Sequence, residues 1–168
     1  MSTPEPLFAA ERSVWTPVNN PATAGFGVKG LPDDWSSTGV IRIDGVPAVA
    51  WMAAPPIGAS RFTANALLSA WTARVDSGVR QNLSKDLGTP EFDDDSLVVM
   101  TQPVVLADRP DIYLQKTEGV IQSPFGPLSS WVFHGIRRNG NAATMARLSV
   151  TAMRTDAFVI ERAELVGS

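Results

Sequence analysis

The sequence predicts an α+β fold, an antiparallel sheet of five or more strands with one or two helices packed on it. Three observations lead to this prediction. Asp44-Gly45 and Asn139-Gly140, dipeptides that suit turns with positive φ, each separate two runs of β-favouring residues. Beyond Gly88, such runs alternate with turn residues to the end of the chain. Ahead of Gly88, apolar residues recur at helical spacing, which places a helix early in the chain.

Four prolines among residues 1–23 predict an irregular N-terminal arm, and residues 24–168 are expected to form one domain. Within that domain, 25–28 predicts a short strand, and 31–35 predicts a turn that ends on Trp35. The first hairpin follows over 38–52. Its Pro47 has no backbone N–H, so we expect the strand that contains it to lie at a sheet edge or to pair irregularly.

Residues 62–87 have two interpretations. Apolar residues recur there at helical spacing, as on one long amphipathic helix: Leu67, Leu68, Trp71, Val75, Val79 and Leu83. Alternatively, residues 64–73 form a strand and a shorter helix follows. Both interpretations make residues 76–87 helical, with Val79 and Leu83 facing the sheet. The first half of the segment stays open.

Strands are expected to make up the rest of the chain. Turn residues separate six candidates, at 96–101, 104–107, 112–117, 131–138, 144–153 and 157–165. Over 147–153, polar and apolar residues alternate, as they do in a sheet that has one wet face.

The composition narrows the function. The chain has no cysteine, which excludes disulfides, thiolate metal sites and cysteine nucleophiles. Its net charge of -3 comes from 17 acidic and 14 basic residues, so no surface for nucleic acid is expected. No apolar run is long enough to cross a bilayer, and the N-terminus lacks the features of a signal peptide. We therefore expect a soluble cytoplasmic protein without membrane insertion, exported only if a leader has been removed.

No set of residues predicts catalysis. His134 is the one histidine, and no Gly-x-Ser-x-Gly elbow offers it a serine. Asp93-Asp94-Asp95 lacks the alternating spacing of a calcium loop. The glycines of 25–30 match a dinucleotide-binding pattern in letters, but a proline-containing turn follows them in place of a helix. We therefore expect no catalytic residue, no cofactor and no metal, and a protein that is not an enzyme.

Large or charged residues near turns are the candidates for binding a partner. They are Trp35, Trp131, His134, Arg137 and Arg138. Trp35 either closes the end of the core or anchors an interface, and we favour the first role. Alternation over 131–136 places Val132 and His134 on one face of their strand and Trp131 and Phe133 on the other.

The order of these elements resembles a known family. The resemblance rests on three segments. The first is the turn at 31–35, and the second is Ala64-Asn65-Ala66-Leu67-Leu68-Ser69. The third is Ser129-Ser130-Trp131, which is followed by the hairpin at 138–141 and two long closing strands. They resemble, in the same order, features of the LpqN-type proteins of actinobacteria, which have a PsbP-like α+β sandwich. We expect the chain to differ from that family in having no leader with a lipidated cysteine and no helix after the last strand. The resemblance implies a PsbP-like sandwich and an accessory, chaperone or adaptor role without catalysis.

The expected function is a non-enzymatic, protein-binding accessory module: chaperone-like, an adaptor or an immunity-type partner. A protein partner is expected, and homo-oligomerisation stays open. One alternative is a carrier of an apolar small molecule held between helix and sheet. Another is a hydrolase that uses His134 with an acid such as Asp111 or Glu118.

Overall fold

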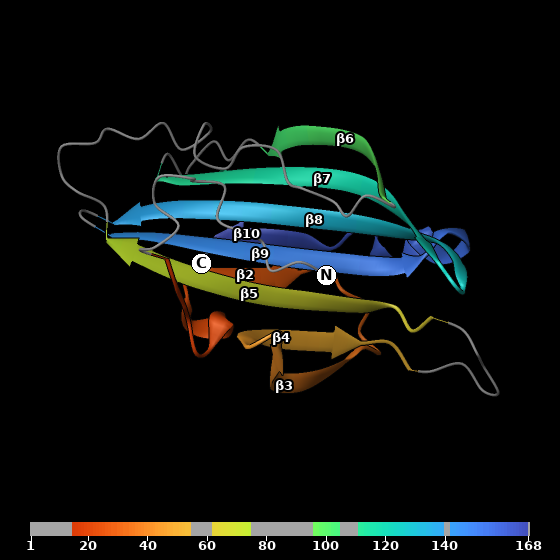
Figure 1. Cartoon of the computed structure of the whole chain (residues 1–168), viewed down its shortest axis with the longest axis horizontal. Helices are drawn as coiled ribbons and strands as arrows, with labels where there is room; N and C mark the ends of the chain where they lie inside the picture. The colour runs from red at the N-terminus through yellow and green to blue at the C-terminus, as the bar shows by residue number, and fades with distance from the viewer. Residues whose placement is uncertain (1–14, 55–61, 75–95, 105–110, 140–141, 168) are drawn as a thin grey trace.

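The computed structural model describes residues 15–54, 62–74, 96–104, 111–139 and 142–167. A large antiparallel sheet dominates them (Figure 1), with strand order β3-β4-β5-β9-β8-β7-β6 and a short β1 that pairs with β5. Its strands are β1 (Thr16–Pro17), β3 (Ser36–Ile43), β4 (Val46–Met52), β5 (Asn65–Arg74), β6 (Ser96–Val104), β7 (Ile112–Ser123), β8 (Gly126–Asn139) and β9 (Ala142–Met153). The prediction of an antiparallel sheet with at least five strands is confirmed.

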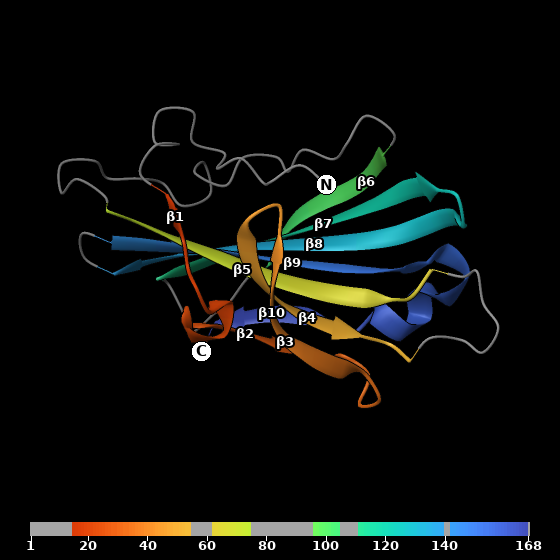
Figure 2. The ribbon, with the colours of Figure 1, turned by 60° about the horizontal axis from the view of Figure 1, so that its bottom comes forward.

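A second, two-stranded sheet lies against one face of the large sheet, as Figure 2 shows. It consists of β2 (Phe26–Lys29) and β10 (Glu164–Gly167), which pair antiparallel although they lie far apart in sequence. We call the face that they cover the sandwich face. Two 3₁₀ helices, η2 (Pro21–Thr23) and η3 (Arg154–Ile160), complete the described structure.

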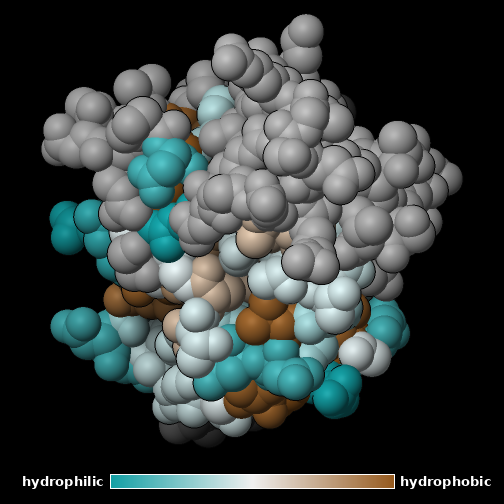
Figure 3. Space-filling model, turned by 90° about the vertical axis from the view of Figure 1, so that its left-hand side faces the viewer, coloured by the Kyte–Doolittle hydropathy of each residue, from teal (hydrophilic) through white to brown (hydrophobic). Residues whose placement is uncertain are grey.

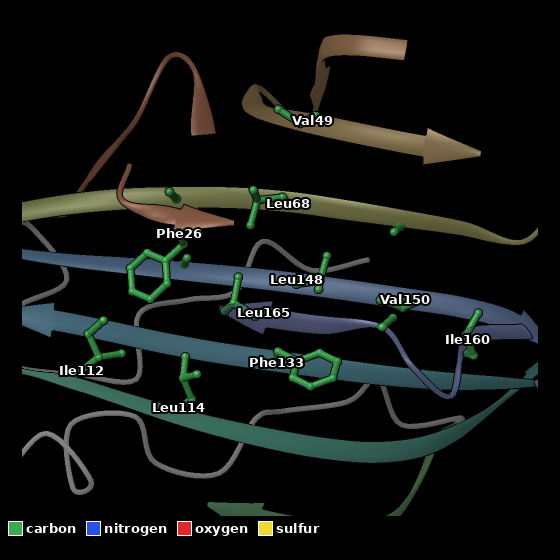
Figure 4. Packing of buried hydrophobic residues seen from close by; sticks show 14 of the residues in the cluster. Phe26, Val49, Leu68, Ile112, Leu114, Phe133, Leu148, Val150, Ile160 and Leu165 are labelled. Atoms are coloured by element: carbon green, nitrogen blue, oxygen red, sulfur yellow. The ribbon is translucent and has the colours of Figure 1, made fainter. Parts of the chain in front are cut away.

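The main core fills the space between the two sheets. Phe26 of β2 and Leu165 of β10 point toward Phe133, Leu148 and Leu114 on the large sheet (Figure 4), and all five are buried. Each strand contributes alternate residues, so Leu148 of β9 faces this core while the residues beside it face the opposite side. The core therefore depends on strands from both ends of the chain.

Both predicted hairpins are confirmed. At the first, Asp44 and Gly45 have φ of 51° and 81°, the two positive values of a type I′ turn. At the second, β8 and β9 pair antiparallel as far as Asn139 opposite Ala142, so Asn139 is the last residue of the strand and not a turn residue, and residues 140–141 lie outside the described residues.

Within residues 62–74, Asn65–Arg74 forms the strand β5, which agrees with one of the two interpretations that the sequence left open. β5 pairs with β9 along its whole length, from Asn65 opposite Thr151 to Arg74 opposite Ala142. Because Leu68 and Ala70 face the sandwich core while Leu67 and Trp71 face away from it, the apolar residues serve two faces of a strand. The helix predicted at 76–87 lies outside the described residues.

The strand predicted at 157–165 is wrong in its first half. η3 occupies Arg154–Ile160, and only Glu164–Gly167 is a strand. The apolar run at 157–160 resembles a strand, yet the chain must turn there from the end of β9 to reach the sandwich face. Ile160 and Ala163 are both buried at a spacing of three residues, and the Ala163 N–H donates to the Ile160 carbonyl at 3.1 Å. In the described residues the fold is thus richer in strands and poorer in helices than predicted.

Two smaller predictions have mixed outcomes. β4 joins β5 only from Val49 onward, so Pro47 lies outside that ladder, opposite Arg42 of β3. Its pairing with β3 is regular, and β4 lies between β3 and β5, so the expected edge position is wrong; Pro47 only lies beyond the end of the β4–β5 ladder. The N-terminal arm is ordered near its end, where β1 pairs with β5 and the Val18 N–H donates to the Ala70 carbonyl at 2.8 Å.

None of the described helices is long and apolar enough to span a bilayer.

Candidate functional site

The face of the large sheet opposite β2 and β10 has a buried polar centre, and we call it the polar face. Its buried polar side chains are Gln115, Thr117, Ser130, His134, Ser149 and Thr151. The Ser130 and Thr151 hydroxyls lie 3.2 Å apart and bond to each other across β8 and β9. Apolar residues of this face, including Trp71, Ile136 and Met145, form a second, smaller core beside the polar residues. Sequence reasoning expected a wet face here and missed its burial.

His134 lies in the middle of the polar face, with 4% of its surface exposed. It stands between Gln115 of β7 and Arg147 of β9 in the strand register. Burial, helped by the positive charge of Arg147, lowers the pKa of His134 to about 3, so the imidazole is neutral at physiological pH. Among the residues that the structure describes, its buried Nδ1 has no hydrogen-bond partner. A base with so low a pKa takes up protons poorly near pH 7.

The acids considered as partners for His134 lie elsewhere. Glu118 pairs with Lys116 at 3.3 Å, and the Lys116 Nζ lies 3.9 Å from the ring centroid of Trp131. Asp111 lies 3.6 Å from the Nε of Arg137, whose guanidinium stands over the ring of Phe26. Trp131 and Phe26 belong to the core of the sandwich face. Both acids are therefore engaged on the side opposite His134.

The five residues predicted to bind a partner do not form one surface. His134 is buried on the polar face, while Trp131 is half-buried on the sandwich face, as the alternation predicted. Arg137, near the end of β8, holds Asp111 and stands over Phe26, so it contributes to the fold. Arg138 pairs with Ala143 through the strand register, and its side chain lies outside what the structure describes.

Trp35, the fifth candidate, lies where its turn meets the core. The Trp35 N–H donates to the Pro32 carbonyl at 3.1 Å, which closes the predicted turn. The side chain is half-buried and packs against the main core. This placement agrees with Trp35 closing the end of the core, the role that we favoured.

Among the strands whose side chains the structure describes, β3 exposes more large apolar residues than any other, and sequence reasoning did not single it out. Val40 is 47% exposed and Ile41 is 36% exposed, although they stand on opposite faces of the strand. β3 is the last strand of the sheet order and pairs only with β4 among the described residues (Figure 1). We call its regular part, Val40–Ile43, the β3 edge. One signal was in the sequence: β3 contains a single charged residue, Arg42, where exposed edges commonly carry several charges.

Other exposed apolar side chains lie at the end of the sandwich where β4, β7 and β9 finish. Met52, Phe125 and Phe158 are exposed there, and the rings of Phe62 and Phe125 are 6.3 Å apart. Figure 3 views the opposite end, where the brown areas outside the grey region are small and separated by teal and pale residues. Within the described ranges, no group of three or more acidic or histidine side chains could hold a metal ion. The acidic run Asp93-Asp94-Asp95 lies outside those ranges.

Comparison with known proteins shows a likeness of fold. No protein-family model and no curated protein matches the chain. The crystal structure of LpqN, a protein involved in cell envelope biogenesis of Mycobacterium tuberculosis, matches with a TM-score of 0.62 at 10% sequence identity. The match covers 90% of this chain and 90% of that chain. The structural part of the resemblance found in the sequence is therefore confirmed, and this protein has the fold of LpqN.

Proposed function

We propose that this protein is a non-enzymatic accessory module that binds a partner protein through the β3 edge. The partner would contribute an extended segment that pairs with β3 as an added strand. The observation that carries the proposal is an exposed strand at the end of the sheet order, with a single charged residue, with Val40 and Ile41 open to solvent and with no described strand on its outer side. Such edges promote pairing with other chains unless they are blocked.

The hairpin geometry defines which backbone groups are available. In a hairpin with a two-residue type I′ turn, the residues next to the turn, Ile43 and Val46, exchange hydrogen bonds. The next pair, Arg42 and Pro47, does not, and the pattern then alternates. The N–H and C=O groups of Val40 and Arg42 therefore point outward from β3. Two donors and two acceptors are ready for an added strand.

A bulge limits the length of this edge. The register between β3 and β4 shifts between Ser37 and Gly39, and Gly39 has φ of 74°. Bulges of this kind interrupt the ladder and reduce uncontrolled pairing between sheets. The interruption favours a short added strand, which suits a specific partner better than open-ended assembly.

Two observations favour binding over the alternative functions. The low pKa of His134 and the placement of Asp111 and Glu118 toward the sandwich face oppose the hydrolase. A carrier of an apolar molecule needs an apolar lining, whereas the centre of the polar face carries Gln115, Thr117 and His134. The likeness to LpqN, a protein involved in cell envelope biogenesis, is compatible with an accessory role.

The test compares two substitutions at one position. Val40→Pro removes an outward N–H that the β3–β4 ladder does not use, while Val40→Thr keeps that N–H and the branched shape. We expect partner capture from native lysate to be retained by wild type and Val40→Thr and lost in Val40→Pro. Phe158→Ser, which removes an exposed apolar side chain elsewhere, should leave capture unchanged. Undiminished capture by a folded Val40→Pro variant would contradict the proposal, and a dimer that Val40→Pro dissociates would assign the edge to a second copy.

A further inference from the structure

We infer that the segment added to β3 carries a carboxylate beside Arg42 and apolar side chains beside Ile41 and Val40. The inference rests on the proposed function and names the chemistry of the partner. Arg42 is the one charged residue of β3, and it is exposed. Its Nη1 donates to the Gly45 carbonyl at 3.2 Å, which holds the guanidinium beside the hairpin. A guanidinium has five N–H donors, so this bond leaves others for a carboxylate.

The register of an added strand determines which side chains meet. A residue directly opposite Arg42 would have its Cβ about 4.5–5.5 Å from that of Arg42, within reach of an ion pair. The next residue of the partner would lie beside Ile41 on the other face, and the third beside Val40. Since these two side chains are 36% and 47% exposed, apolar partners would remove apolar surface from water on both faces.

The charge preference is local. The whole chain has a net charge of -3, which on its own would disfavour an acidic segment. At contact distance the guanidinium dominates, because charges farther away than about 8 Å are largely screened at physiological salt. A basic residue opposite Arg42 would be destabilising, since like charges meet there.

A second copy of this chain fits the edge less well. Antiparallel pairing of two β3 strands centred on Val40 places Arg42 opposite Thr38, and pairing centred on Arg42 places two guanidinium groups opposite each other. The sequence of β3, Ser-Ser-Thr-Gly-Val-Ile-Arg-Ile, contains no acid, and the acids that flank it, Asp34 and Asp44, lie in turns, Asp44 with a φ of 51°. Pairing of two β3 strands therefore gives Arg42 no carboxylate. A different chain, with an acidic residue in an apolar strand, can give Arg42 a carboxylate and Val40 and Ile41 apolar neighbours.

The test uses two capped peptides, Ser-Thr-Glu-Val-Val-Thr-Ser and the same sequence with Lys in place of Glu. Binding to the isotopically labelled full chain is followed by NMR through the amide signals of Val40 and Arg42. We expect both signals to shift, with the Glu peptide binding about threefold to tenfold more tightly than the Lys peptide. Arg42→Glu should reverse this order. Arg154→Glu, an equal change of charge at an exposed residue of η3, should leave the order unchanged.

The outcomes separate the two proposals. Shifts at Val40 and Arg42 with equal affinity for both peptides, in wild type and in Arg42→Glu, would overturn the acidic preference and leave strand addition standing. Reversal by Arg154→Glu as well would show a general charge effect and would also overturn the inference. Shifts confined to other residues, or none at millimolar peptide, would overturn both the inference and the use of the β3 edge.

Discussion

β8 and β3 belong to the same sheet and differ in almost every other respect. β8 lies between β7 and β9 and pairs with both, whereas β3 pairs with β4 alone among the described strands. Residues 132–136 of β8 are all buried, whereas seven of the eight residues of β3 are exposed. Both strands contain β-branched and apolar residues. Position in the sheet therefore decides whether such residues stabilise the fold or remain available to a partner.

The difference between the two strands indicates that the centre of the sheet determines stability and that its β3 edge is available for recognition. In the centre, each side chain is confined from both faces, so substitutions there should act on folding. At the edge, side chains and outward backbone groups make few contacts within the chain, so substitutions should act on binding.

Truncation of a central apolar side chain should cost the most. Leu148 of β9 is fully buried in the main core, between the two sheets. Leu148→Ala should lower the free energy of unfolding by about 2–5 kcal/mol, because it removes buried surface and leaves a cavity. Denaturant melts measure this change. A loss below about 1 kcal/mol would mean that the sandwich core is much looser than its burial indicates.

Enlarging a central residue should also destabilise the fold. A Cβ at Gly135 of β8 would lie 2.6 Å from the Phe26 Cε1 and 2.7 Å from the Leu114 Cδ2. Gly135→Ala should therefore cost about 1–3 kcal/mol through overpacking, because β2 must move away from β8. A matched comparison exchanges the same two residue types at an exposed position of a strand, and Ala142→Gly on β9 does so. Gly45→Ala is unsuitable, because Gly45 has a positive φ and alanine would be strained there. Equal stability of wild type and Gly135→Ala would contradict the close approach of the two sheets.

His134 should make stability depend on pH. Its pKa is lowered from 6.5 to about 3 in the folded protein, so below pH 6.5 the unfolded chain binds a proton that the folded protein does not. The contribution of His134 to the free energy of unfolding has its full value above pH 6.5. It falls by about 1.4 kcal/mol per pH unit as the pH drops toward 3. Between pH 7 and pH 5, wild type should lose about 2 kcal/mol more than His134→Gln, which cannot take up that proton. Parallel pH profiles of the two proteins in chemical denaturation would rule out a buried neutral imidazole.

Replacing valine by threonine should change the free energy of unfolding very little at the edge of the sheet and clearly more in its centre. Val40→Thr on β3 should change the free energy of unfolding by less than about 0.5 kcal/mol, because the hydroxyl meets water. Val150→Thr on β9, where the side chain is fully buried in the main core, should cost about 1–3 kcal/mol for a buried hydroxyl. Comparable losses at both positions would show that the β3 edge is covered within the folded chain.

Local chemistry allowed several elements to be predicted from the sequence. Asp44-Gly45 suits positive φ at two successive positions, so the first hairpin and its register follow from two residues. The opposite orientation of Trp131 and His134 follows from the period of a strand.

The tertiary structure decided what lies beside each strand. The sequence places His134 on a face, but its burial and low pKa depend on segments that are distant in the chain. Ala157–Ile160 resembles a strand locally and becomes part of η3, because the chain turns there toward the sandwich face. Trp35, Trp131, His134 and Arg137 looked alike as candidate binders, yet they lie in separate surroundings.

The sheet-forming runs and their turns can be recognised in the sequence because they depend on neighbouring residues, and the composition excludes cysteine chemistry. The order of the strands depends on contacts between residues far apart in the chain, such as β5 with β9 and β2 with β10. That order alone leaves β3 at the edge and buries β8. The sequence placed Val40 and Ile41 in a strand of the first hairpin, but only the strand order shows that this strand is the last one described on its side of the sheet and that both side chains are exposed.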